Sequence, residues 1–303
     1  MEEYIGKVKL NYEFYKGEDT YTDGEVEDKM LEIVKNCQTA TELEEKLMEE
    51  NDWAYLYHFS TIRQNVLDWY DFDKDAEVLE IGAGCGAISG LFCRKTKKVT
   101  AVDLSKKRSY INAYRNKEYD NLEILVGNFE DIEFRQKYDY ISLIGVLEYS
   151  IYYINSENPF EDMLKKVKSL LKPGGKLLLA IENKYGLKYW AGATEDHTGR
   201  LFDGIQGYNG VDRVRTFSRR GLEKLLKKAG FETNDFYYPV PDYKLPLEIY
   251  SDNYLPKPGD IKAYTPAYDR DRYMIFDEVL AYESLCEDGM FPEFANSFIV
   301  ISC

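Results

Sequence analysis

The chain has 303 residues, of which 44% are hydrophobic and 31% charged, so it can bury a folded core and does not have a disordered composition. Its formal net charge of −15 argues against nucleic acid and anionic membranes as partners. The five cysteines form no CxxC pair, and the first ten residues show no basic segment followed by an apolar one. We therefore expect a cytoplasmic protein without a disulfide framework or membrane insertion.

Residues 1–56 are acidic and predict a small cap on a main domain formed by residues 57–303. Ser60–Trp69 is expected to be a helix that begins at the N-cap Ser60. Strands then alternate with helices as far as residue 181, which predicts a parallel sheet with helices on both faces. The predicted strands are Val78–Ile81, Lys98–Val102, Leu122–Val126, Tyr138–Leu143 and Lys176–Ile181, and the predicted helices are Ala87–Arg94, Ser105–Asn116 and Phe160–Leu171.

The alternation of predicted strands and helices ends after residue 181. Segments 182–216 and 239–295 have no clear period and are expected to be insertions that cover a substrate. Between them lie a predicted helix, Ser218–Ala229, and a strand, Phe231–Tyr238; a final strand, Asn296–Ser302, is expected to run antiparallel to the latter. The pattern predicts an α/β fold with a doubly wound sheet of about seven strands.

A strand that runs into a glycine-rich turn is the sharpest signal for a binding site. Val78–Ile81 is followed by Gly82, Gly84 and Gly86, and glycine lets the backbone turn sharply and approach a ligand closely. The next helix begins there and offers unpaired N–H groups. Asp103 ends the second strand, where a carboxylate can accept both ribose hydroxyls of an adenosine. These features indicate a nucleotide-type cofactor site.

Two classes of cofactor remain open at this point. The spacing Gly82-x-Gly84-x-x-Ala87 also fits a dinucleotide fingerprint, so an NAD(P)-dependent oxidoreductase is an alternative, although the chain has no obvious Tyr-x-x-x-Lys constellation. Further features favour a methyl donor: Glu80 precedes the glycines, the segment Gly127–Asp131 follows the third strand, and the turn Leu171–Lys176 precedes the fifth.

Together these motifs resemble the series of class I S-adenosylmethionine-dependent methyltransferases, from Ser60 to about Val240. The resemblance implies a Rossmann-like fold and S-adenosyl-L-methionine as cofactor. The glycine loop would wrap the methionine part, Asp103 would take the ribose, Asn128 would face the adenine, and the loop Ile144–Tyr149 would pass the sulfonium. The cofactor-binding residues expected on this basis are Glu80, Gly82, Ala83, Gly84, Gly86, Asp103, Leu104, Asn128, Phe129, Ile144, Tyr149 and Arg63. Arg63 could instead be a solvated helix charge, and Tyr149 could simply fill the core.

A narrower resemblance rests on segments such as Ile181–Tyr189, Glu195–Arg200 and Tyr237–Pro246. They are similar to a bacterial methyltransferase group that occurs beside glycosyltransferases in surface-polysaccharide pathways. This implies a sugar-like or other small polar acceptor and a possible association with glycosyltransferases.

His197 is the candidate general base. It follows Glu195 and Asp196 inside the segment 182–216, and a histidine beside carboxylates can take a proton near neutral pH. A structural hydrogen bond is the alternative. We expect no metal, because no cluster of His, Asp or Glu has metal-ligand spacing. A degenerate, non-catalytic binding protein is a further alternative, but Glu80, Asp103 and the three loop glycines are all intact.

Overall fold

The structure is a computed structural model that describes residues 2–17, 24–37, 39, 42–46, 52–209, 214–262 and 271–303. The chain divides into two compact units. The first unit comprises residues 1–142 and 170–175, and the second comprises residues 143–169 and 176–303. The predicted boundary between residues 56 and 57 stays a prediction.

The first unit is a sheet with strand order β1-β2-β5-β4-β3-β6. Its strands are β1 (Glu2–Ile5), β2 (Val8–Asn11), β3 (Glu77–Ile81), β4 (Lys98–Asp103), β5 (Leu122–Val126) and β6 (Tyr138–Ile144), of which residues 143 and 144 are counted with the second unit. The pairs β3–β4, β4–β5 and β2–β5 are parallel, and β1–β2 is an antiparallel hairpin. Because the carboxyl ends of parallel strands lie at the same edge of a sheet, this register brings the carboxyl end of β3 beside that of β4.

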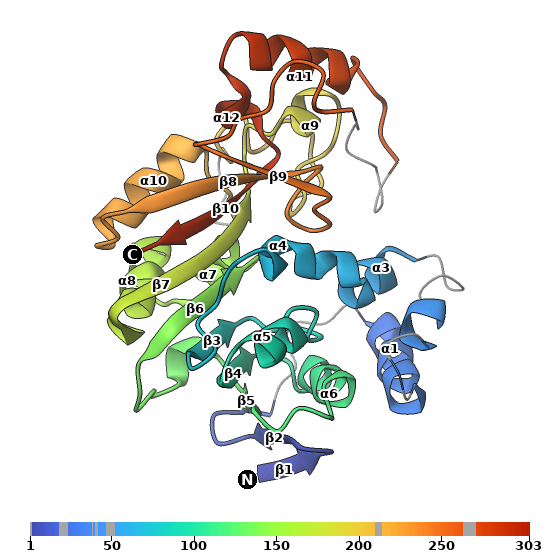
Figure 1. The fold of residues 1–303 in the computed structure, drawn as a ribbon, viewed down its shortest axis with the longest axis vertical. Coiled ribbons are helices and arrows are strands. Elements are labelled where there is room, and N and C mark those ends of the chain that lie inside the picture. The colour runs from blue at the N-terminus through green and yellow to red at the C-terminus, as the bar shows by residue number, and fades with distance from the viewer. Residues whose placement is uncertain are drawn as a thin grey trace. The chain divides into compact units, whose positions relative to one another are not determined.

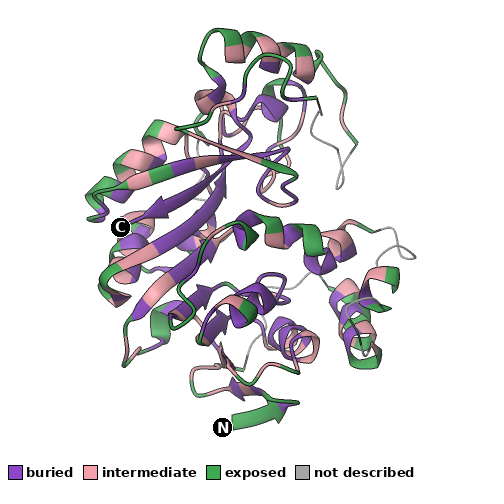
Figure 2. Cartoon of the chain, viewed as in Figure 1, coloured by how far each residue is buried: buried purple, intermediate pink, exposed green. Residues whose placement is uncertain are grey.

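Helices cover this sheet and bury its apolar residues. The helices of this unit are α1 (Glu25–Asn36), α3 (Trp53–Phe59), α4 (Asn65–Asp68), α5 (Ser89–Lys95) and α6 (Lys106–Arg115), with short 3-10 helices η1 (Thr61–Gln64) and η2 (Phe129–Asp131) and a helical stretch at 42–46. Helices α5 and α6 pack on the strands (Figure 1), and the strands β3 and β4 are almost wholly buried (Figure 2). Helix α6 also contacts α1, where Arg108 Nε donates to Glu27 Oε1 at 2.6 Å.

The second unit has strand order β7-β10-β8-β9. Its strands are β7 (Leu171–Glu182), β8 (Asn234–Val240), β9 (Glu248–Ser251) and β10 (Ser297–Ser302). Its helices are η3 (Leu147–Tyr149), α7 (Ser150–Tyr153), α8 (Pro159–Leu170), α9 (Leu187–Trp190), α10 (Arg219–Lys228), α11 (Glu278–Glu287) and α12 (Phe291–Phe294). The end of α8 and the start of β7, residues 170–175, are counted with the first unit. Strand β10 is antiparallel to both β7 and β8, and all six of its residues are buried. It is therefore an interior strand of this group, as is β8.

The expectation of seven strands is wrong, because the described residues form ten. The additional strands are β1, β2 and β9. Each has four residues, too few to show a clear alternation, and each depends on pairing with a neighbour. In the first hairpin Gly6, with φ of +59°, makes the turn, and its backbone conformation is one that glycine adopts readily.

None of the helices in the described part of the chain has the length and apolar character required to cross a bilayer.

Candidate functional site

The glycine loop of the first unit joins β3 to α5 in a left-handed backbone. Gly82, Gly84 and Gly86 have φ of +70°, +53° and +75°, which L side chains adopt only with strain. A Cβ on Gly86 would also lie 2.3 Å from Asn112 Oδ1. The sequence therefore needs glycine here for two reasons, the turn itself and the close approach of α6.

Asp103 ties this loop to the end of β4. Its Oδ2 accepts from the Gly84 amide at 2.7 Å and its Oδ1 accepts from the Ser105 amide at 2.9 Å. The carboxylate is 9% exposed, and its burial raises the pKa of the side chain. Each carboxylate oxygen has a second lone pair, so Asp103 can hold the loop and still accept hydroxyl groups of a ligand.

Glu80 is buried under the loop and bonded to α5. Its Oε2 accepts from Ser89 Oγ at 2.5 Å, and Ser89 in turn accepts from Asn112 Nδ2 at 2.9 Å. Burial raises the pKa of Glu80 to about 8, and the nearby Asp103 adds to this effect. The carboxyl group is therefore largely protonated at neutral pH, and its hydrogen-bond partner is a serine of α5.

The remaining predicted residues of the first unit lie at the ends of strands or on the helices before the sheet. Asn128 follows β5, and its Oδ1 accepts from the Glu130 amide at 3.1 Å, so Asn128 is the N-cap of η2. The next residue, Phe129, is buried. Leu104, directly after Asp103, is half-buried. Arg63 is 5% exposed and its guanidinium lies 4.1 Å from the centre of the Tyr57 ring, so it is not a solvated charge.

Ile144, Tyr149 and His197 belong to the second unit. Gly145, with φ of +67°, turns the chain after Ile144, and a Cβ there would lie 2.8 Å from the Tyr243 hydroxyl oxygen. The Tyr149 and His197 rings meet edge to face with their centres 5.3 Å apart. The structure thus brings these two predicted residues together.

His197 sits between two buried carboxylates. Its Nδ1 lies 3.1 Å from Glu195 Oε1, and its Nε2 lies 3.7 Å from Glu148 Oε1. Glu195 also accepts from the backbone amides of His197 and Thr198, so it fixes the turn that carries the imidazole. Burial alone would lower the pKa of His197, but the neighbouring carboxylates of Glu148 and Glu195 raise it well above its usual value.

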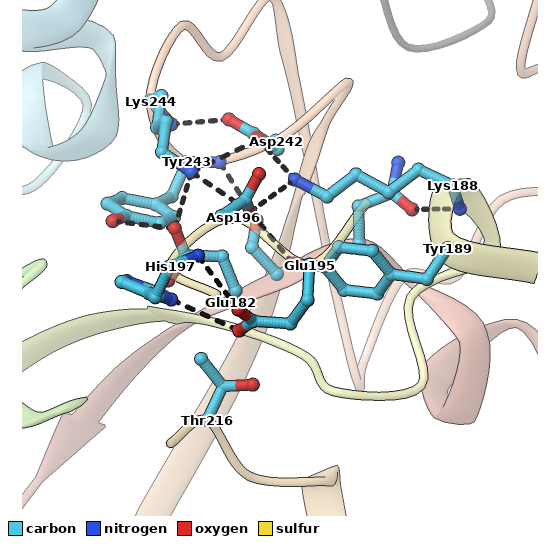
Figure 3. Close-up of polar contacts among 12 residues, drawn as sticks. Glu182, Lys188, Tyr189, Glu195, Asp196, His197, Thr216, Asp242, Tyr243 and Lys244 are labelled. Carbon is cyan, nitrogen blue, oxygen red and sulfur yellow. Dashed lines mark hydrogen bonds and ion pairs between the residues drawn. The ribbon is translucent and has the colours of Figure 1, made fainter. Parts of the chain in front are cut away.

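A network of ion pairs surrounds this histidine (Figure 3). Lys244 Nζ bonds to Glu182 Oε1, and Lys188 Nζ donates to Asp196 Oδ2 at 2.8 Å. Asp242 accepts from the same Lys188 at 3.2 Å. Burial alone would raise the pKa of Asp196, but the two lysines lower it overall. These side chains are charged and nearly enclosed, so they hold the segment after β7 in one arrangement.

The spacing of residues along the chain did not assign Glu148 or Glu182 to this site, and it marked Glu195 only as an acidic neighbour of His197. They come from η3, the end of β7 and the following turn, and no short spacing connects them. Two weak signals existed, since Glu148 precedes Tyr149 and Glu182 directly follows a predicted strand. Neither indicates a shared site without the tertiary structure.

The family of methyltransferase domains matches residues 53–234. Among curated proteins, the chain is similar to ribosomal RNA small subunit methyltransferase A of Mycoplasma capricolum (26% identity over 180 residues, 58% of this chain and 59% of that protein). It is also similar to malonyl-[acyl-carrier protein] O-methyltransferase of Priestia megaterium (30% over 118 residues, 38% of this chain and 40% of that protein). The chain therefore spans less than two thirds of the length of these relatives. Phosphoethanolamine N-methyltransferase 2 of Haemonchus contortus, solved with S-adenosyl-L-methionine, is 16% identical, with a TM-score of 0.49, covering 90% of this chain and 59% of that one.

Proposed function

The chain belongs to the family of methyltransferase domains, and on this premise we propose that it transfers the methyl group of S-adenosylmethionine to an oxygen of a small polar acceptor. The observation that carries the proposal is the bond between Asp103 and the Gly84 amide. It places a carboxylate at the glycine loop, where both can act on one adenosine ligand. S-adenosylmethionine is the cofactor, and its contacts are assigned to Glu80, Asp103, Asn128 and the loop glycines.

The chemistry needs a positioned nucleophile and a proton acceptor. A lone pair of the acceptor oxygen attacks the methyl carbon, the carbon–sulfur bond breaks, and sulfur keeps the electron pair, which leaves S-adenosylhomocysteine. The acceptor proton must go to a base. We assign this role to His197, whose Nδ1 is held by Glu195 at 3.1 Å, so that Nε2 is the nitrogen that takes the proton. Because the neighbouring carboxylates raise the pKa of His197, the imidazole accepts a proton only in its deprotonated form, and methyl transfer should increase with pH.

The proposal also specifies the chemical class of the methyl acceptor. The motifs around Ile181–Tyr189 and Glu195–Arg200 support a sugar-like intermediate and an association with glycosyltransferases, in the cytoplasm. The net charge of −15 disfavours RNA as the acceptor. A dinucleotide-dependent oxidoreductase is the weaker account of the glycine loop, because the family match is to methyltransferases.

The test is a methyl-transfer assay against a panel of nucleotide sugars, free sugars, small amines and a ribosomal RNA fragment. Release of S-adenosylhomocysteine with a hydroxylated sugar acceptor supports the proposal. Turnover with RNA or amines alone would reject the acceptor class while leaving the cofactor intact. Binding of a nicotinamide dinucleotide without binding of S-adenosylhomocysteine would reject the methyltransferase activity itself.

A further inference from the structure

We propose that Glu148, Glu182 and His197 of the second unit bind a divalent transition-metal ion of the Zn²⁺ or Mn²⁺ class. Each residue offers one ligand atom, and the three atoms lie within 4.8 Å of one another. Two carboxylates and one imidazole form a mixed oxygen and nitrogen donor set, which suits these ions better than Mg²⁺ or Ca²⁺. The proposal rests on the proposed function only for its role in catalysis, since binding can be tested by itself.

Two carboxylate oxygens at this place have no hydrogen-bond partner within the described residues. They are Glu148 Oε2 and Glu182 Oε2, and each side chain is only 1% exposed. A buried carboxylate oxygen without a donor costs free energy, because it has lost its hydration shell and gained nothing in return. A bound cation would satisfy both oxygens at once.

The second carboxylate oxygen of Glu182 is already bonded, which orients this ligand. Glu182 Oε1 accepts from the Tyr243 hydroxyl at 3.2 Å and from Lys244, so Oε2 is the oxygen left for an ion. Figure 3 draws Tyr243 and Lys244 with the contacts that they make to Glu182. Ligands whose second oxygen is bound in this way are the usual arrangement around protein metal sites.

The histidine is held as metal-bound histidines are. Its Nδ1 faces the Glu195 carboxylate at 3.1 Å, which forms the carboxylate–histidine pair that leaves Nε2 to the metal. The distance from Nε2 to Glu148 Oε1 is 3.7 Å, too long for a good hydrogen bond. Two ligand atoms that are each about 2.1 Å from one ion lie about 3.0 to 3.5 Å apart, so an inward shift of roughly 1 Å would close the site.

Charge balance also favours a cation. Four buried carboxylates and the less buried Asp196 face two ammonium groups, so the acids outnumber the lysines by 5 − 2 = 3, and a proton on His197 offsets only one of these charges. These groups are Glu148, Glu182, Glu195, Asp196 and Asp242 against Lys188 and Lys244. A divalent ion would reduce the excess to −1. Uncompensated charge is expensive in a buried site.

The consequence deepens the proposed function. An acceptor hydroxyl bound to the ion would have a lowered pKa and would lose its proton more readily. His197 would then act as a ligand in the metal-loaded protein, and as a free base only without metal. The experiment must therefore measure metal binding separately from cofactor binding.

The experiment uses the full chain, stripped with a chelator and titrated calorimetrically with ZnCl₂, MnCl₂ and MgCl₂. We expect one Zn²⁺ or Mn²⁺ per chain, with Zn²⁺ the tighter and Mg²⁺ the weakest. The double variant Glu148→Gln/Glu182→Gln should lose at least about 100-fold in affinity. The matched control is Glu161→Gln/Asp162→Asn, which removes two acids that pair with Lys165 on α8 and should change affinity less than about twofold.

Two further measurements keep the proposal falsifiable if the double variant does not fold. Pulsed electron paramagnetic resonance of Mn²⁺ in the wild-type protein should show nitrogen coupling that His197→Gln abolishes; the chain has only one other histidine. Titration of the same samples with S-adenosylhomocysteine tests the cofactor site independently. Cofactor binding without saturable metal binding, or metal binding that the double variant retains, overturns the metal site and leaves the methyltransferase proposal standing. Metal binding without cofactor binding supports the metal site and overturns the methyltransferase proposal.

Discussion

Replacing Asp103 by asparagine should weaken cofactor binding while leaving the fold in place. The asparagine has the same shape, but it has one acceptor oxygen where Asp103 uses two, for the Gly84 and Ser105 amides at 2.7 and 2.9 Å. It also lacks the charge that strengthens bonds to ligand hydroxyls. The expected loss of binding free energy is the difference between hydrogen bonds from the ribose hydroxyls to a charged acceptor and to a neutral one.

The magnitude follows from these bonds. A hydrogen bond to a charged group contributes about 1.5–3 kcal/mol, which corresponds to roughly a 10- to 150-fold increase in Kd. The effect on stability should be smaller, because burial raises the pKa of Asp103 and the neutral amide avoids that cost of desolvation. The variant should therefore show a large change in cofactor affinity and a small change in the free energy of unfolding.

The assay is calorimetric titration with S-adenosylhomocysteine, together with thermal unfolding of each variant. Asp71→Asn is the control, since Asp71 is an exposed carboxylate of the same unit. If Asp103→Asn and Asp71→Asn bind within twofold of the wild-type protein, Asp103 does not hold the ribose and the cofactor assignment of this residue is wrong.

Three other variants test the environment of the two sites. Gly86→Ala should destabilise the protein by about 1–3 kcal/mol, because its Cβ meets Asn112 Oδ1 at 2.3 Å and φ is +75°; an unchanged melting temperature would show that α6 can move away. Burial raises the pKa of Glu80 from 4.5 to about 8, so the folded state keeps a proton that the unfolded state releases, and the free energy of unfolding should fall as pH rises through this window, by at most about 1.4 kcal/mol per unit. Glu80→Gln should flatten that slope in urea titrations, and an identical slope would contradict the assignment. Lys188→Met should cost about 3 kcal/mol because it leaves Asp196 buried without this ammonium partner, and a loss below about 1 kcal/mol in urea unfolding would mean that Lys244 suffices.

Local patterns in the sequence were enough to locate the cofactor loop. A buried strand, three glycines at alternate positions and an acid after the next strand are short-range features, and each has a direct physical cause in backbone geometry or hydrogen bonding. Helix starts were readable for the same reason: Ser105 and Ser218 accept from the amides of Arg108 and Gly221 as N-caps, and that bond spans only three residues.

Other features depend on partners far away in the chain. The four-residue strands β1 and β2 exist because β2 pairs with β5, and β9 exists because it pairs with β8. The partner of Glu80 is a serine of the next helix, a choice that follows from how α5 and α6 pack. None of these partners is visible in a window of a few residues.

The cluster of Glu148, Glu182 and His197 shows the same limit most clearly. The acidic residues next to His197 in the sequence predicted that it is a general base. The lack of metal-ligand spacing along the chain predicted that no metal binds. Only the tertiary structure places the end of β7, the helix η3 and the turn 195–199 within reach of one another. Spacing along the chain specifies a site when a single helix or loop carries its ligands, whereas here the folding of three separate elements determines which side chains meet.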